Sequence, residues 1–255
     1  MLAMRRALLA NMAFGTLLLT VAALPQAKAD FDEIRLTTVN WEPFYDEGIE
    51  QQGFITALTR EAFERAGYDT EVDFVPWARA MYDVEQGVRH VLLGAYYTEE
   101  RAETFIASDR LYTTRVGLVA LEDLGRDSYD SLRDLSDYDI GYGRGWATSE
   151  EFDQADYLNR IPEDDNVLNV RKLYADRIDM IAMNFDRFMA ITREEGVDPD
   201  EAVFLDPPLQ ESGLYLMVSR AIPNGEELVE EFNRALAEMR QDGTYDEILE
   251  GLGVR

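Results

Sequence analysis

The sequence predicts an α/β protein. Segments with the two-residue period of a strand alternate with segments with the helical period along the whole chain. Neither an internal repeat nor a low-complexity linker interrupts this alternation. The chain has 255 residues, which is large for one hydrophobic core and sufficient for two smaller lobes.

The N-terminal half gives three strands separated by two helices. Residues 34–39 read as a strand, and Gly53 precedes an amphipathic helix over 54–66 whose apolar residues fall on one stripe. After that helix, the pattern predicts a strand over 71–75, a helix over 77–86 and a short buried strand over 91–93.

The rest of the chain contains two strongly strand-like segments, 116–121 and 214–219, with a series of shorter elements between them. The shorter elements are a helix over 131–135, a strand over 138–142, a helix over 149–159, strands over 166–170, 178–183 and 202–205, and a helix after Asn184. Two helices, over 225–240 and 245–252, end the chain.

The N-terminal 29 residues have the three parts of a secretory signal peptide. Arg5 and Arg6 are basic, residues 7–24 are apolar, and Ala-Lys-Ala at 27–29 forms a small-residue cleavage site. The apolar run is also about long enough to span a bilayer as a retained anchor, but Pro25 and the cleavage site favour removal. Because the chain has no Cys, a lipid anchor at a mature Cys is excluded, and the pattern predicts a free periplasmic protein.

The chain is strongly acidic, with 51 Asp and Glu residues against 24 Lys and Arg residues and a net charge of −27. Such a field repels nucleic acid and anionic membrane surfaces, so neither is expected as a partner. The acids are spread along the chain and lack the spacing of a calcium loop. The acidity is therefore interpreted as an aid to solubility and not as a metal site.

Signals for enzymatic chemistry are weak. The single histidine, His90, precedes a predicted buried strand and is interpreted as a structural residue. The chain contains no nucleophile elbow, phosphate-binding loop or zinc spacing. Gly141, Gly143 and Gly145 lack the rest of a dinucleotide-binding fingerprint. No catalytic residue, cofactor or metal is therefore predicted.

Two motifs point to the binding of a small carboxylate. The segment 98–101 (Thr-Glu-Glu-Arg) follows a loop of small and aromatic residues at 94–97, and an arginine there presents a planar, permanently charged fork to a carboxylate. The segment 41–44 (Trp-Glu-Pro-Phe) places an aromatic ring on the loop after the first predicted strand. In their order and spacing, these motifs resemble the bacterial extracellular solute-binding proteins of family 3, the substrate-binding components of ABC transporters for polar amino acids.

The resemblance runs from about residue 34 to the C terminus, and it implies a two-lobed periplasmic-binding-protein-like fold of type II. The segments 116–121 and 214–219 would cross between the lobes and form the hinge. The first lobe would then comprise residues 30–116 and 215–255, and the second lobe, inserted between them, residues 117–214. The N-terminal signal peptide would end at residue 29.

The resemblance also implies ligand contacts in the first lobe. Arg101 has the position of the arginine that binds the ligand carboxylate; the alternative is a surface arginine paired with a nearby acid. Trp41 falls where the family places an aromatic ring over the ligand, and Trp77 lies near a second wall position, although core packing is the alternative for both. Arg79 would reach the mouth of the cleft or remain solvated. Gly94 and Tyr96 replace the hydroxyl residues that are common just before the arginine motif, and Tyr96 is kept as a candidate contact.

In the second lobe, Arg144, Gly145 and Trp146 lie in a strand-to-helix loop. Family members bind ligand at this loop with main-chain amides and a hydroxyl, and such loops lie near helix N-termini that favour anions. The hydroxyl position itself is an alanine here, for which Thr148 or Ser149 would substitute.

Asn184 stands where the family has an acidic residue that takes the ammonium group of the ligand. Asp186 follows two residues later, which turns it around the predicted helix. Losing that charge weakens ammonium recognition by roughly 1.5–3 kcal/mol. An organic anion, a modified amino acid or an osmolyte therefore fits as well as an ordinary α-amino acid.

The function that the resemblance implies is capture of a small carboxylate-bearing solute, an amino acid or related compound, for uptake by an ABC permease in the inner membrane. A monomer is expected. Two alternatives stay open. One is an enzyme on the same fold that resembles cyclohexadienyl dehydratase, which would need a poised acid or base in the cleft. The other is a ligand-sensing partner of a membrane receptor.

Overall fold

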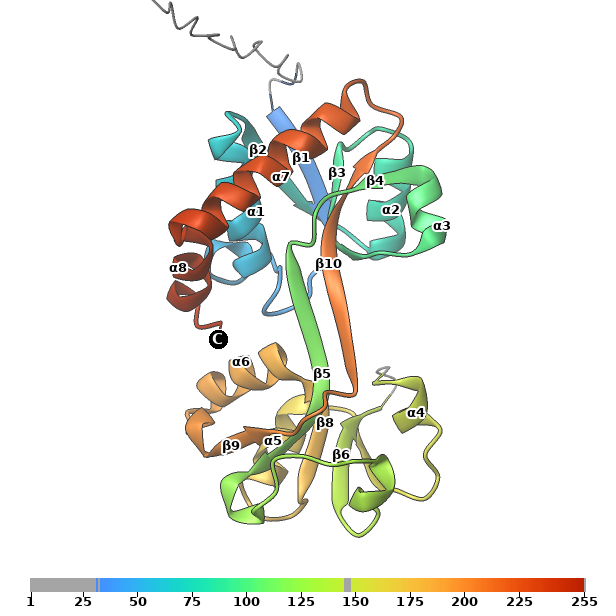
Figure 1. The fold of residues 1–255 in the computed structure, drawn as a ribbon, viewed down its shortest axis with the longest axis vertical. Helices are drawn as coiled ribbons and strands as arrows, with labels where there is room; N and C mark the ends of the chain where they lie inside the picture. Colours follow the sequence, from blue (N-terminus) through green and yellow to red (C-terminus); the bar gives the residue numbers. More distant parts are fainter. Residues whose placement is uncertain (1–30, 32, 145–147, 255) are drawn as a thin grey trace, which may run out of the picture.

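The computed structural model describes residues 31, 33–144 and 148–254. These residues form two lobes joined by two long strands, β5 (Tyr112–Leu121) and β10 (Gln210–Ser219), which run side by side from one lobe into the other (Figure 1). The strands form one sheet in the order β2-β1-β3-β10-β5-β8-β6-β7, to which β4 is added beside β10 and β9 beside β5. The α/β class predicted from the sequence is confirmed.

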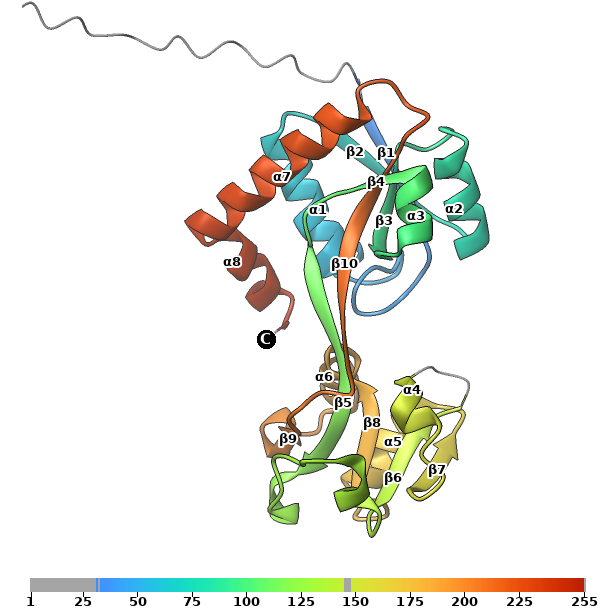
Figure 2. The same ribbon diagram turned by 45° about the vertical axis from the view of Figure 1, so that its right-hand side comes forward.

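The first lobe, at the top of Figure 1, is built on three parallel strands with helices on both sides. Its strands are β1 (Glu33–Thr38), β2 (Asp69–Phe74), β3 (Val91–Tyr96) and the short β4 (Phe105–Ala107). Its helices are α1 (Phe54–Arg65), α2 (Trp77–Glu85), α3 (Glu99–Thr104), α7 (Gly225–Asp242), α8 (Thr244–Gly251) and the 3₁₀ turn η1 (Glu50–Gln52). Figure 2 shows α1, α7 and α8 on one side of this sheet and α2 and α3 on the other.

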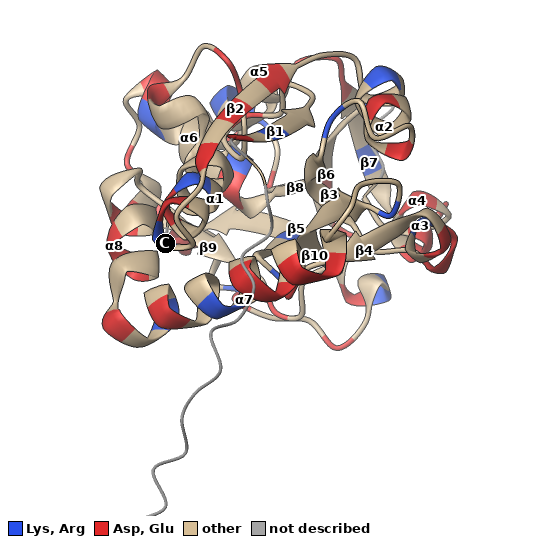
Figure 3. Cartoon of the chain, turned by 90° about the horizontal axis from the view of Figure 1, so that it is seen from above, with Lys and Arg blue, Asp and Glu red and all other residues tan. Residues whose placement is uncertain are grey.

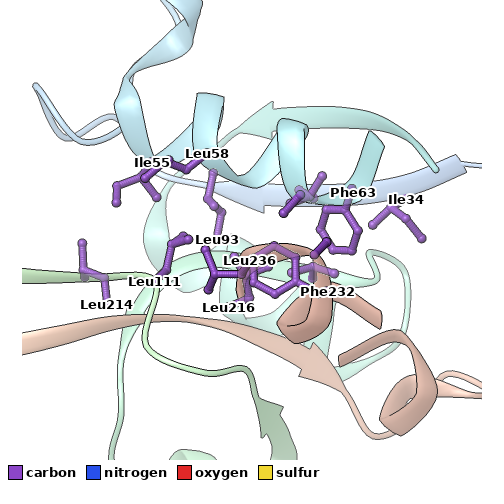
Figure 4. Packing of buried hydrophobic residues seen from close by; sticks show 14 of the residues in the cluster. Ile34, Ile55, Leu58, Phe63, Leu93, Leu111, Leu214, Leu216, Phe232 and Leu236 are labelled. Atoms are coloured by element: carbon purple, nitrogen blue, oxygen red, sulfur yellow. The ribbon is translucent and has the colours of Figure 1, made fainter. Parts of the chain in front are cut away.

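The core of the first lobe follows from the alternation of side chains along its strands. Leu93 belongs to the apolar cluster under α1 and α7, whereas its neighbour Leu92 belongs to the cluster under α2. Figure 4 shows Phe63 of α1 beside Phe232 of α7, and their ring centroids are 5.0 Å apart. Burial of these apolar residues on both faces of the sheet stabilises the lobe.

The second lobe follows the same plan with parallel strands at its centre. Its strands are β6 (Asp139–Gly143), β7 (Asn159–Glu163), β8 (Met180–Asn184) and the short β9 (Ala202–Phe204). Its helices are α4 (Glu150–Asp153), α5 (Asn166–Leu173) and α6 (Phe185–Glu195), with 3₁₀ turns η2 (Glu122–Leu124), η3 (Leu132–Leu135) and η4 (Pro199–Glu201). Leu118 and Val119 of β5 contribute to separate clusters on the two faces of this sheet.

The two crossing strands pair with each other between the lobes, and each of them then pairs with a strand of one lobe. Residues 112–116 of β5 pair with residues 210–214 of β10, after which β10 continues beside β3 and β5 continues beside β8. The predicted strands over 116–121 and 214–219 are therefore confirmed as parts of longer strands. The predicted lobe boundaries fall inside these two strands, and the division at those residues stays a prediction.

The prediction of a strand over residues 166–170 is wrong, because these residues begin the helix α5. The Asp165 side chain accepts a hydrogen bond from the main-chain N–H of Val167 at 2.8 Å and so caps the helix. Val170 and Leu173 are buried one turn apart. Val167, Leu168 and Val170 gave this segment the apolar character of a strand, whereas the N-cap and the three-residue spacing carried the correct signal.

The predicted helix over residues 149–159 is also wrong in extent. Helix α4 covers only Glu150–Asp153, and the chain then forms the strand β7, which the sequence did not predict. This strand contains Pro162 and lies at the edge of the sheet, where a missing N–H is tolerated. With Ile161 as its only large apolar residue, it has no alternating pattern to recognise.

Gly94 of β3 provides a test of the first lobe. Its φ is +72°, and a Cβ atom there would overlap the ring of Tyr45, whose hydroxyl donates a hydrogen bond to the Gly94 carbonyl at 2.9 Å. We expect Gly94→Ala to lower the free energy of unfolding by roughly 3 kcal/mol, from left-handed backbone strain plus overpacking. The measurement is urea denaturation.

Gly125→Ala is the matched control, because Gly125 also has a positive φ, +67°, but has open space around its Cα. This variant should lower the free energy of unfolding by only about 1 kcal/mol, which is the cost of the left-handed backbone strain alone. Equal losses for the two variants would show that the ring of Tyr45 does not constrain Gly94.

Candidate functional site

A cavity of about 310 Å³ lies between the lobes and is lined by residues of both. Its described lining residues are Asn40, Trp41, Glu42, Tyr96, Val116, Gly143, Thr148, Asn166, Ala182, Met183, Asn184 and Arg187. Most of them lie at or just after the carboxyl ends of the parallel strands β1, β3, β6 and β8. Open α/β sheets bind their ligands at these ends, so the topology itself brings the loops together.

Aromatic rings form the wall that the first lobe contributes. Trp41 is held in a tight turn in which its main-chain N–H donates to the carbonyl of Tyr45 at 2.6 Å. The Trp41 ring lies 4.3 Å from the ring of Phe44 and stands nearly perpendicular to the ring of Tyr96, at 6.1 Å between centroids. Trp41 is therefore packed on the core and also exposed to the cavity. Burial raises the pKa of Tyr96, which keeps its hydroxyl neutral.

Arg101 lies in the first turn of α3, beside the cavity wall and not among the described lining residues. Its Nη1 donates to the main-chain carbonyl of Tyr96 at 2.6 Å, and its Cζ lies 5.6 Å from the centroid of the Trp77 ring. No acidic side chain of the described residues forms an ion pair with it, so the alternative of a paired surface arginine does not hold in this part of the chain. The structure thus brings Arg101, Tyr96 and Trp77 together.

Trp77 and Arg79 begin helix α2 but have different surroundings. Trp77 is half-buried, packs beside the cluster under α2 and provides a face for the Arg101 guanidinium. Arg79 is exposed, and its Nε donates to Asp83 one turn later at 2.7 Å. The structure does not bring Arg79 into the cavity.

The loop after β6 is only partly described. Gly145 and Trp146, both predicted as ligand contacts, lie outside the described residues. Arg144 is exposed and pairs with Asp164 at 2.6 Å, outside the cavity lining, and this pair raises the pKa of Arg144. Thr148, one of the two hydroxyl residues suggested for the second lobe, is buried and lines the cavity.

Asn184 is the last residue of β8 and the N-cap of α6. Its Oδ1 accepts a hydrogen bond from the main-chain N–H of Arg187 at 3.0 Å. Its Nδ2 is buried and has no hydrogen-bond partner among the described residues. Asn184 is among the residues that line the cavity, although this nitrogen is itself not exposed to it.

A charged pair that the sequence did not predict spans the cavity. Glu42 of the first lobe accepts from Nη1 of Arg187 of the second lobe at 2.9 Å, and both residues line the cavity. Glu194 also lies 3.3 Å from the same Nη1. The only available signal was position, since Glu42 follows Trp41 and Arg187 lies one helical turn after Asn184.

Asp186 does not replace the missing acid of the cavity, because it faces the crossing strand. It accepts a hydrogen bond from the hydroxyl of Tyr112 at 2.7 Å, and Arg115 of β5 lies close enough to stabilise its charge. Burial raises the pKa of Asp186 to about 6. The predicted turn around the helix is thus seen in the structure.

Other chemistry finds little support in the described part of the chain. The Nδ1 atom of His90 accepts a hydrogen bond from the main-chain N–H of Arg35 at 3.2 Å, and burial lowers the pKa of His90 to about 4, so it is a neutral packing residue of the first lobe. Residues 31, 33–144 and 148–254 contain no cluster of three metal-ligating side chains. Within the same ranges, no helix has the length and apolar character needed to cross a membrane. Acidic side chains lie on helices of both lobes, including α7 and α8 (Figure 3).

Comparison with known proteins gives a consistent result. The profile of the bacterial extracellular solute-binding proteins, family 3, matches residues 35–252. The arginine-binding extracellular protein ArtP of Bacillus subtilis (strain 168) is 28% identical over 219 residues, covering 83% of this chain and 82% of ArtP.

Two solved structures illustrate the fold. The second substrate-binding domain of Lactococcus lactis GlnP, in an open conformation, has a TM-score of 0.71 at 20% identity and covers 88% of this chain and 96% of that one. A substrate-binding protein of a polar amino acid ABC uptake transporter from Streptococcus thermophilus has a TM-score of 0.74 at 15% identity, covering 87% and 86%.

A two-lobed α/β structure with a cavity between the lobes is the architecture of a binding protein. The chain belongs to the bacterial extracellular solute-binding proteins, family 3. The predicted family, fold class and solute-binding function are confirmed.

The raised pKa of Asp186 predicts a pH dependence of stability. The folded state holds a proton on this carboxyl between about pH 4 and 6 that the unfolded state has already released, so stability falls as the pH rises through that window. Asp186→Asn keeps the acceptor for Tyr112 and removes the titration. We expect the variant to lose less stability than the wild type between pH 4 and 7, by roughly 2 kcal/mol, in denaturant titrations at each pH.

Asp156→Asn is the control, because the Asp156 side chain is fully exposed. Its pH profile should overlay on that of the wild type. Overlapping profiles for Asp186→Asn and the wild type would contradict the burial of an ionisable Asp186.

Proposed function

We propose that this protein is a periplasmic solute-binding protein, exported by a signal peptide over residues 1–29 that is then removed. It captures a small carboxylate-bearing solute, an amino acid or related compound, and delivers it as a monomer to an ABC permease in the inner membrane. The observation that carries the proposal is the cavity lined from both lobes at the ends of the parallel strands. Its volume of about 310 Å³ suits a metabolite of amino-acid size. The relatives named for arginine binding and for polar amino acid uptake support the same solute class.

In this proposal, Arg101 anchors the carboxylate of the solute, and Trp41 and Tyr96 cover its body. Support comes from the absence of an acidic partner of Arg101 among the described residues and from its position against Tyr96 and Trp77. The Trp77 ring supports the guanidinium from one side. A charged hydrogen bond from arginine to a carboxylate is worth roughly 1.5–3 kcal/mol.

Asn184 and the loop with Gly145 and Trp146 close on the solute from the second lobe. Closure is a bend in β5 and β10 that moves residues 117–214 against the rest of the chain, since these strands are the main-chain connection between the lobes in Figure 1. The Glu42–Arg187 pair supports a closing motion, because it already joins the lobes across the cavity. Arg79 and Arg144 would contact the solute only after their ion pairs with Asp83 and Asp164 break.

The proposal is tested by a thermal-shift screen with amino acids, organic acids and osmolytes, followed by calorimetry on the probes that raise the Tm. We expect Arg101→Ala to lower the affinity for the best carboxylate probe by at least tenfold, because the anchoring hydrogen bonds are lost. Arg101→Lys should lower this affinity as well, since lysine keeps the charge but not the planar fork. The unfolding free energy should change by less than about 1 kcal/mol.

Arg171→Ala is the control, because Arg171 forms an exposed pair with Glu195 on the outside of the second lobe. It should leave the affinity unchanged. If no carboxylate probe raises the Tm of the wild type, or if Arg101→Ala binds the best probe as tightly as the wild type, the proposed function is wrong.

A further inference from the structure

The C-terminal end of the described chain forms a second contact between the lobes. Arg193 lies in the last turn of α6, in the second lobe, and its Nη1 donates a hydrogen bond to the main-chain carbonyl of Gly253, in the first lobe. Neither residue is among the described lining residues of the cavity. The contact therefore joins the lobes without forming part of the described cavity wall.

The carbonyl that Arg193 binds is anchored to the first lobe. The main-chain N–H of Gly253 donates to the carbonyl of Glu250 at 3.0 Å, and that of Val254 donates to the carbonyl of Leu249 at 2.8 Å. The Val254 side chain is buried in the apolar cluster under α1 and α7. Because the segment 252–254 is fixed to α8 and to this core, its contact with Arg193 ties α6 to the first lobe.

The crossing strands separate this contact from the cavity. Val116 of β5 lines the cavity, whereas its neighbour Arg115 lines a small hollow of about 40 Å³ together with Arg193 and Gly253. Consecutive residues of a strand point to opposite faces. Figure 1 and Figure 2 both show α8 and the end of the chain on one side of β5 and β10, and α3 and α4 on the other. The Arg193 contact and the cavity thus lie on opposite faces of the ribbon.

A hinge in this ribbon moves its two faces in opposite directions. When a rotation brings the cavity walls together, atoms on the other face move apart. Helix α6 has a contact on each face, since Arg187 meets Glu42 across the cavity at 2.9 Å and Arg193 meets Gly253 on the far side. A groove of about 620 Å³ between α6 and α8, beside Arg193, leaves room for the movement.

We propose that Arg193 is a positioning residue that restrains closure of the lobes and so lowers the affinity for the solute. It binds the segment 252–254 while the cavity is open, and it releases this segment when the walls come together. The measured affinity is that of the closed form reduced by the fraction of molecules that can close, and Arg193 sets part of this fraction. The effect on affinity rests on the proposed function, whereas the effect on lobe separation does not.

The separation of the lobes can be measured without any solute. Because the chain has no Cys, Glu103→Cys on α3 and Glu150→Cys on α4 allow one spin label on each lobe at exposed positions. In electron paramagnetic resonance distance measurements, we expect Arg193→Ala to shift the distances toward shorter values, because the restraint is lost. Glu42→Gln, which removes a charge from the contact on the cavity face, should shift them toward longer values. A general loss of packing does not produce opposite shifts.

Affinity provides the second readout, by calorimetry with the tightest-binding carboxylate probe of the screen. Arg193→Ala should bind this probe more tightly than the wild type, by about threefold or more, since a larger fraction of molecules closes. Arg193→Lys keeps a charged donor and should give a smaller gain. Arg171→Ala is the control, because Arg171 pairs with Glu195 within the second lobe, and it should change neither the distances nor the affinity.

The outcomes separate this inference from the proposed function. If Arg193→Ala leaves the distances in the free protein unchanged or lengthens them, the role of Arg193 is overturned while the proposed function stands. Binding of the probe by this variant no more tightly than by the wild type overturns it as well. If no carboxylate probe binds, the proposed function fails, and the distance measurement alone then decides whether Arg193 restrains closure.

Discussion

The structure depends on the pairing of β5 with β10. Residues 112–116 of β5 pair with residues 210–214 of β10, and each strand then joins the sheet of one lobe. One short antiparallel ribbon therefore connects two separate hydrophobic cores. It also orients the two sheets so that the carboxyl ends of β1 and β3 face those of β6 and β8, and the loops that follow these strands supply most of the cavity lining. Binding proteins use this arrangement because polar groups on opposite walls can meet the same solute.

The first turn of α6 connects the parts of this arrangement. Successive residues on a helix point about 100° apart, and the side chains of this turn have different partners. Asn184 caps the helix and is one of the residues at the cavity, Phe185 packs on Phe204 at 4.3 Å between ring centroids, Asp186 binds Tyr112, and Arg187 pairs with Glu42. One helical turn thus links the second-lobe core, a crossing strand, the opposite lobe and the solute cavity. Substitutions here are expected to affect binding and lobe position together.

The sequence predicted what local patterns encode. Apolar strands, amphipathic helices and the spacing of the Trp41 and Arg101 motifs led to the α/β class and the family. The errors arose where local pattern and tertiary position disagree: the apolar residues at the start of α5 resemble those of a short strand, and the edge strand β7 has little apolar character. The Glu42–Arg187 pair had no local signal, since its partners are 145 residues apart in the chain and meet only when the lobes face each other. The sequence could likewise suggest a role for Asn184 but not that its side-chain oxygen caps α6.

The central claim is that one solute is held by both lobes at once. The most direct measurement is a crystal structure of the protein with the tightest-binding probe from the screen. The account predicts a molecule between the Trp41 and Tyr96 rings on one side and Asn184 on the other, with its carboxylate within hydrogen-bonding distance of Arg101. A probe bound to the outside of the molecule, or in contact with one lobe alone, would contradict it.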